Sequence, residues 1–258
     1  MKKVALITAI LMVAMLRAYG VDTTEADPQT MASLTSMTTT DLESRGDILR
    51  AEREYAEAIR YYQAALKREP GNSMLYNKIG MTEMKRGNEA VADTYFQKAV
   101  KLNPNNADAL NNLGVVAFFH KNFGKSVKFY KKALAVDETN ATYHSNLGTA
   151  WFTQNKLDRA MAEYGRAMEL DPEVFLRSNQ GGSIARVGSA EDRAKYEYML
   201  AKLYAQRGDL ERCFQWLAKA KEDGYHNMRD VYKDAEFAKT RQDPRLAQIV
   251  PPPAAAGY

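Results

Sequence analysis

Apolar residues recur at helical spacing along most of this chain. In the segments LYNKIGMTEMKRG, residues 75–87, and NEAVADTYFQKAV, residues 88–100, they fall three and four positions apart, which gives each segment one apolar side. Gly87 and Asn88 stand where the two segments meet, and these residue types are typical of turns. The pattern therefore predicts two antiparallel helices joined by a short turn.

This pair of helices is one unit of a repeat. Gly46, Gly80, Gly114 and Gly148 are each 34 residues apart. Four further columns share the spacing: Ala58, Ala92, Ser126 and Ala160; Tyr62, Phe96, Tyr130 and Tyr164; Ala65, Ala99, Ala133 and Ala167; and, with one gap, Pro70, Pro104 and Pro172. Because one helical hairpin cannot bury its apolar face alone, this period predicts a stack of hairpins, an all-α solenoid.

Each column has a physical role, which the second unit illustrates. Gly80 on the first helix, with Ala92 and Ala99 on the second, lets the two backbones approach closely. Phe96 fills the remaining space, since protein interiors are close-packed. Pro104 ends the second helix, because proline cannot continue it.

These columns resemble the tetratricopeptide repeat family, whose pattern has a large residue, Leu-Gly, an aromatic, Ala, an aromatic and Pro. The resemblance runs from residue 39 to residue 174 without a gap. It implies a right-handed α-solenoid of about five helix-turn-helix units with a C-terminal capping segment. Arg45, Glu138 and His144 depart from the pattern; a terminal unit has a polar outer face, so Arg45 fits a cap.

The repeat pattern divides the chain into segments. Repeats one to four occupy 41–174, a Gly-rich insert follows at 175–193, and a degenerate fifth repeat occupies 194–227. The fifth repeat has these residues in signature columns: Leu200, Ala201, Tyr204, Cys213, Leu217 and Ala220. Residues 228–250 are similar to the helical caps that follow bacterial repeat arrays, and 251–258 are expected to be a disordered tail.

Residues 1–20 are typical of a secretory signal peptide, because Lys2 and Lys3 precede an apolar run at 4–16 and small residues follow it. The run is short for a bilayer core of roughly 30 Å, so an uncleaved anchor in the inner membrane is the alternative. Residues 21–40, rich in Thr and Ser, are expected to be a flexible linker. Export without a structural disulfide favours a bacterial periplasm.

Composition excludes several classes of protein. The net charge is +4, but loss of residues 1–20 removes Lys2, Lys3 and Arg17 and leaves 33 basic and 32 acidic residues, or +1. The remaining charge does not favour nucleic acid as a partner. One cysteine and three histidines exclude a disulfide scaffold and a Cys/His zinc site.

No catalytic, cofactor or metal site is recognisable, so we expect no enzyme. The segment GGSIARVGS, residues 181–189, lacks the Lys-Ser/Thr of a phosphate loop. Cys213 stands in an alanine column and is expected to be a buried thiol. A stripe of lysines, spaced by four, three and four, favours a solvated outer face over contact with anionic lipid or polymer; it consists of Lys121, Lys125, Lys128 and Lys132.

The resemblance also implies a binding surface. In this family the first helix of each unit lines the concave surface, and the matching residues here are Asn77, Met81 and Met84; Asn111, Asn112, Val115, Phe118 and Phe119; Ser145, Asn146, Thr149 and Phe152; and Tyr198 and Lys202. Amides can bond an extended peptide, and the column Met84, Phe118 and Phe152 can take its apolar side chains. Core packing is an equally weighted alternative for Phe118 and Phe152.

The predicted function is a non-catalytic adaptor or scaffold that holds a peptide or helix of a partner protein in the concave groove. The family's periplasmic members imply a partner in envelope assembly, secretion or pilus biogenesis. The alternative is a self-associating structural protein without a peptide ligand, since fold alone does not choose between them. No membrane span is expected in the mature form.

Overall fold

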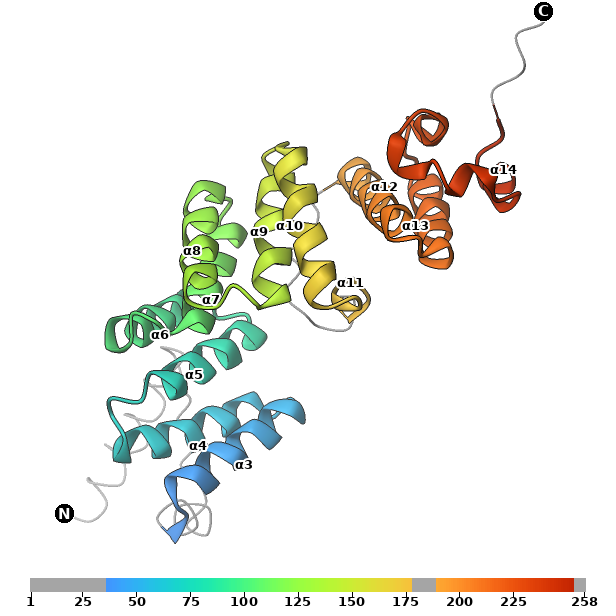
Figure 1. Ribbon diagram of the computed structural model, residues 1–258. Coiled ribbons are helices and arrows are strands. Elements are labelled where there is room, and N and C mark those ends of the chain that lie inside the picture. The colour runs from blue at the N-terminus through green and yellow to red at the C-terminus, as the bar shows by residue number, and fades with distance from the viewer. Residues whose placement is uncertain (1–35, 178–188, 253–258) are drawn as a thin grey trace, which may run out of the picture. The chain divides into compact units, whose positions relative to one another are not determined.

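The computed structural model describes residues 36–177 and 189–252, and every regular element in these ranges is a helix. The signal-peptide prediction, most of the linker, the centre of the Gly-rich insert and most of the tail lie outside the described residues. The described residues fall into two compact units, divided after Gly71; Figure 1 labels the helices of both in chain order. The all-α solenoid predicted from the 34-residue period is confirmed by consecutive packed helix pairs.

The first unit contains one helix pair, α3 (Thr39–Ala51) and α4 (Tyr55–Arg68). Helix α3 begins inside the segment 21–40 that the sequence assigns to the linker. The reason is a capping box, in which Thr38 and Asp41 satisfy each other's backbone N–H groups. Arg45 is exposed, as expected for a terminal repeat.

The second unit begins with three regular pairs. They are α5 (Ser73–Arg86) with α6 (Glu89–Leu102), α7 (Ala107–Phe119) with α8 (Phe123–Val136), and α9 (Ala141–Thr153) with α10 (Leu157–Leu170). Helix α6 also packs on α7, and α8 on α9, so each pair covers the apolar face of the next. The first helix of each pair is capped by an asparagine whose side chain accepts from the backbone; these are Asn72, Asn106 and Asn140.

The glycine column sets the distance within each pair. A Cβ added at Gly80 would lie 2.5 Å from Cε1 of Phe96, and one at Gly148 would lie 2.6 Å from Cδ1 of Tyr164. The aromatic ring therefore rests directly on the backbone of the partner helix. Only glycine allows this approach, which explains why the glycine and aromatic columns recur together.

The two other departures from the family pattern contact each other. His144 Nδ1 lies 2.7 Å from Glu163 Oε2, and its Nε2 lies 3.0 Å from the backbone oxygen of Glu138. The ring therefore replaces an apolar contact with a polar bridge between α9, α10 and the preceding turn.

The predicted insert, 175–193, is helical at both ends. Helix α11 (Val174–Arg177) places Phe175 in the core, with its ring edge-on to Tyr164 at 5.4 Å. Helix α12 (Ala190–Arg207) then begins at a capping box between Ser189 and Asp192. The glycines at 181, 182 and 188, on which the insert prediction rests, lie outside the described residues.

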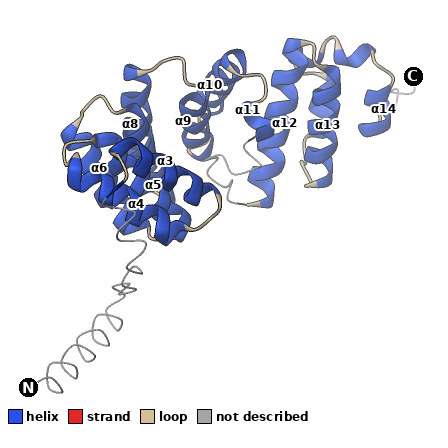
Figure 2. Cartoon of the chain, turned by 90° about the horizontal axis from the view of Figure 1, so that it is seen from below, coloured by secondary structure: helices blue, strands red, loops and turns tan. Residues whose placement is uncertain are grey.

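A fifth pair and a closing segment complete the second unit (Figure 2). Helix α12 packs on α13 (Leu210–Glu222). The predicted helical cap consists of short turns: η2 (Met228–Tyr232), η3 (Ala235–Phe237), η4 (Thr240–Gln242) and α14 (Arg245–Ile249). They bury Val231, Phe237 and Leu246 against the core, and Cys213 is buried beneath Thr240.

Candidate functional site

The predicted asparagines bond to one another between neighbouring repeats. Asn112 Nδ2 donates to Asn77 Oδ1 at 2.9 Å, and Asn146 Nδ2 donates to Asn111 Oδ1 at 2.9 Å. Three of the four are buried, and Asn112 is half-buried. Each bond contributes about 1 kcal/mol, so this amide ladder holds successive first helices together.

The apolar column serves packing. Phe118, 8% exposed, lies edge-on to Phe123 with ring centroids 5.1 Å apart, and Phe152, 5% exposed, lies edge-on to Tyr196 at 5.9 Å. Met84 is partly buried against the same core. Little of either phenylalanine ring is therefore open to a partner.

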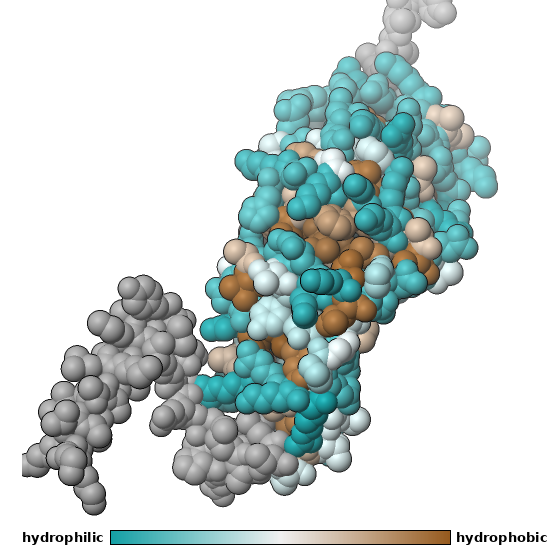
Figure 3. Space-filling model, turned by 90° about the vertical axis from the view of Figure 1, so that its left-hand side faces the viewer, coloured by the Kyte–Doolittle hydropathy of each residue, from teal (hydrophilic) through white to brown (hydrophobic). Residues whose placement is uncertain are grey.

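The other predicted residues of the first helices differ in exposure. Val115, Ser145 and Thr149 are buried, and Tyr164 donates from its hydroxyl to Thr149 Oγ1 at 3.1 Å. Met81 is half-buried. Phe119 is 47% exposed. The face in Figure 3 is largely hydrophilic, with hydrophobic residues gathered near its middle.

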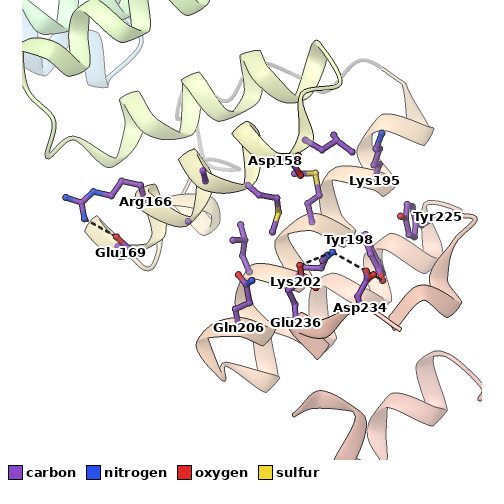
Figure 4. Close-up of a pocket in the computed structure, with 16 residues that line it drawn as sticks. Asp158, Arg166, Glu169, Lys195, Tyr198, Lys202, Gln206, Tyr225, Asp234 and Glu236 are labelled. Carbon is purple, nitrogen blue, oxygen red and sulfur yellow. Dashed lines mark hydrogen bonds and ion pairs between the residues drawn. The ribbon is translucent and has the colours of Figure 1, made fainter. Parts of the chain in front are cut away.

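Tyr198 and Lys202 lie elsewhere, in a cavity of about 790 Å³ between α10 and α12 (Figure 4). Leu157 and Met161 line it from α10, and Met199 and Leu203 join Tyr198 and Lys202 from α12. Tyr225, in the turn after α13, and Asp234 and Glu236, from the capping segment, close it. The cavity therefore joins apolar walls to a polar end.

Tyr198 is fixed at that polar end. Its ring stacks on Tyr225 with centroids 4.3 Å apart and an interplanar angle of 22°, and its hydroxyl donates to Asp234 Oδ2 at 3.0 Å. Burial and the hydrogen bond to Asp234 raise the pKa of Tyr198 far above its usual value. The hydroxyl is therefore a neutral donor at physiological pH.

Lys202 bridges two carboxylates. Its Nζ lies 3.2 Å from Asp234 Oδ2 and 3.0 Å from Glu236 Oε1. Burial opposes the charge, but the hydrogen bonds to Glu236 and Asp234 outweigh it and raise the pKa of Lys202. The amine therefore stays charged and ties the capping segment to α12, and one positive charge faces two negative ones.

Gly165 keeps the cavity open on the α10 side. A Cβ added there would meet only Leu203 Cδ2, at 3.7 Å. At the rim, Lys195 Nζ donates to Asn155 Oδ1 at 2.8 Å, and Gln206 is exposed. A methyl group at 165 would thus make an ordinary van der Waals contact, and a larger side chain would extend into the cavity that Gly165 lines.

A buried carboxyl group lies behind the cavity, on the side of α12 that faces α13. Glu197 is 7% exposed, and burial together with the nearby Asp223 raises its pKa to about 7. Its Oε2 has no hydrogen-bond partner among the described residues. Asp223 is itself 2.5 Å from Arg193 Nε.

The side chains that line the cavity are of few chemical kinds: aliphatic, methionine, tyrosine, glutamine and charged. The cavity lining contains no serine, threonine, cysteine or histidine, the residue types of most nucleophile–base pairs. Within residues 36–177 and 189–252 no group of three or more His, Cys, Asp or Glu side chains could hold a metal ion. In the same ranges, no helix has the length and apolar character of a membrane span.

The repeated hairpins and their columns define a helical-repeat protein. The chain belongs to the tetratricopeptide repeat family. Four models of this family match it, at residues 41–72, 75–106, 95–128 and 122–174, and together they span about half of the chain.

Several solved structures are similar to this chain. TTC0263, a thermophilic TPR protein from Thermus thermophilus, is 20% identical, with 83% of this chain and 99% of that chain covered and a TM-score of 0.50. MamA from Desulfovibrio magneticus RS-1 is 20% identical, with 71% and 93% covered and a TM-score of 0.49. YrrB, described as a TPR protein with an unusual peptide-binding site, is 18% identical, with 84% and 98% covered and a TM-score of 0.49. No curated protein sequence matches this chain.

Proposed function

We propose that this protein is a non-catalytic adaptor that binds a peptide segment of a partner protein in the cavity between α10 and α12. The observation that carries the proposal is the cavity itself, about 790 Å³, within the range of about 300–1,000 Å³ typical of ligand sites. Tetratricopeptide repeats generally present such surfaces to protein partners.

The lining suits a peptide with alternating polar and apolar side chains. Leu157, Met161 and Leu203 offer apolar contact, and methionine adapts to varied shapes. At the other end the exposed parts of Asp234 and Glu236, with side chains 28% and 22% exposed, can accept hydrogen bonds from peptide N–H groups.

Filling the cavity tests this proposal. Gly165→Trp adds an indole to the open wall, and Gln206→Trp does so from the rim without touching the core. Gln63→Trp, at an exposed position of α4 that belongs to neither proposed site, is the matched control. Peptides are selected on the full chain from a random display library, and their affinities are compared for the three variants by fluorescence anisotropy.

The expected result is a loss of at least about ten-fold, or about 1.4 kcal/mol, for both cavity variants and none for Gln63→Trp, with unchanged circular dichroism. Equal affinity in all variants would exclude the cavity. Oligomers in light scattering with no selected peptide would favour self-association.

We also propose that the protein is exported and acts in the bacterial cell envelope. The support for export is the basic, apolar and small-residue pattern of residues 1–20. A fusion of residues 1–40 to alkaline phosphatase in a bacterium is expected to be active, and N-terminal sequencing then distinguishes cleavage from an uncleaved anchor. An inactive fusion would contradict export.

A further inference from the structure

One face of α8 carries positive charge alone. The helix has four lysines, at 125, 128, 131 and 132, and no acidic residue. At 3.6 residues per turn they fall within an arc of about 120°, and all four are exposed. Like charges three and four residues apart destabilise a helix, so this face costs stability.

Basic side chains from α8 and α10 meet around Trp151 of α9. Lys131 Nζ, Lys156 Nζ and the Arg159 guanidinium lie 5.6, 4.7 and 4.9 Å from the centroid of its ring. Three cations from two helices and the α9–α10 turn therefore converge on one indole. These cations, the other lysines of α8 and Lys121 before it are called the basic patch below. Its members are Lys121, Lys125, Lys128, Lys131, Lys132, Lys156 and Arg159.

The patch is not neutralised from within. Other helices pair their cations with an acid three residues away, as in Arg60–Glu57 and Arg86–Glu83. Among the described residues, no member of the patch has an ion pair with a carboxylate. Its charge is therefore available to a partner.

The repeat architecture does not require this charge. The columns of Lys125, Lys128 and Lys131 hold Val91, Thr94 and Gln97 one repeat earlier. They hold Arg159, Ala162 and Gly165 one repeat later. The concentration of lysines is thus particular to the third repeat, and a folding role shared by all repeats does not explain it.

The form of the patch favours carboxylates as ligands. Trp151 is 7% exposed, and Lys125 and Lys132 lie 5.8 and 6.0 Å from the ring centroid of the half-buried Phe129. These rings are not open platforms for stacking nucleic-acid bases. Only Arg159 has the planar fork that matches phosphate; the lysines are point charges on flexible stems, which suit a mobile acidic chain. The large exposed hydrophobic residues that flank the patch in sequence are Phe119 and Val136, and two such residues do not make the apolar face with which a helix enters a lipid layer.

We propose that the basic patch is a second docking site, separate from the cavity, for a protein segment rich in Asp and Glu. Complementary charge would steer such a segment to α8 and the α9–α10 turn. The site is independent of the cavity, so either proposal can fail without the other.

The test uses the full chain and a fluorescein-labelled oligoglutamate peptide, followed by anisotropy at low and high salt. Lys128→Glu with Lys132→Glu reverses two charges of the patch. Lys98→Glu with Lys101→Glu is the matched control, because both lysines are exposed on α6 and Lys98 occupies the column of Lys132 one repeat earlier. Circular dichroism confirms that both variants fold.

The expected result is binding that weakens at least about ten-fold in the patch variant and no more than about two-fold in the control, and that falls as salt shortens the screening length. Equal losses in both variants, or no binding by the wild type, would overturn the proposal. The proposal would also be overturned if binding of phosphatidylglycerol vesicles or of oligothymidylate depended on Lys128 and Lys132 while binding of the peptide did not.

Discussion

Two junctions of the second unit are held together in different ways. Between α7 and α9 the contact is uncharged, a hydrogen bond between Asn146 and Asn111 that has its counterpart one repeat earlier between Asn112 and Asn77. Between α12 and the capping segment it is ionic, made by Lys202 with Asp234 and Glu236. Between α10 and α12 an open cavity remains.

This difference shows where a repeat protein can acquire a specific site. A 34-residue column repeats the same close packing, so regular junctions leave little free surface. Where the register breaks after Val174, the next helix is positioned by residues found only once, including Ser189, Phe175 and the capping segment. The cavity forms at that break, and the predictions below separate the two kinds of junction.

The largest expected effect is loss of packing in the regular region. Phe118→Ala removes a buried ring and should lower the free energy of unfolding by about 3–5 kcal/mol. Phe119→Ala, the neighbouring residue at 47% exposure, should change it by no more than about 0.5 kcal/mol. Urea unfolding followed by circular dichroism measures both, and a small effect at Phe118 would restore its role as a groove residue.

The next largest effect is a pH-dependent change in the free energy of unfolding, caused by Glu197 in the fifth helix pair. Because folding raises the pKa of Glu197 from 4.5 to about 7, its protonated form contributes stability below pH 4.5 that is lost as pH rises through about 7. Glu197→Gln should therefore match the wild type near pH 4 and exceed it by up to about 3 kcal/mol above pH 7. Urea unfolding across this range measures the effect.

Glu191→Gln, at an exposed position of the same helix, is the control and should not reproduce that divergence. If the free energy of unfolding of the wild type rose relative to that of Glu197→Gln between pH 5 and pH 8, ionised Glu197 would be stabilising. That result would contradict the burial described.

The smallest effect compares two glycines. Gly165→Ala introduces a methyl group that meets only Leu203 at 3.7 Å, and should stabilise α10 by about 0.5–1 kcal/mol through helix propensity. The same change at Gly148 would put the added Cβ 2.6 Å from the ring of Tyr164. It should lower the free energy of unfolding by about 1–3 kcal/mol. Thermal unfolding of the two variants tests whether the α10 wall is open, and destabilisation of both would show that it is closed.

The sequence predicts the regular part of this fold well, because period, glycine approach and aromatic filling all repeat. It also marks Tyr198 and Lys202, which lie in the cavity. It does not show the bonds between Asn111 and Asn146, since residues 35 positions apart meet only once the curvature of the stack is known. The asparagine caps at 72, 106 and 140 could have been found, because they too recur every 34 residues.

The cavity itself could not be predicted from the columns. Its walls come from α10 and α12 on either side of the insert, and from Asp234 and Glu236 in short turns with no repeat pattern. No periodic signal fixes the separation of such elements. Nor does a column indicate that the small residue at 165 would line a cavity.

The central claim, that a partner peptide enters the space between α10 and α12, can be tested by a reporter at the rim. Gln206→Cys places a thiol for an environment-sensitive dye beside the cavity, and the native Cys213 is buried; Gln63→Cys places the same dye at an exposed position of α4 that belongs to neither proposed site. Titration with a selected peptide is expected to shift the emission at residue 206 and leave residue 63 unchanged. A shift at residue 63 with none at residue 206 would contradict the account.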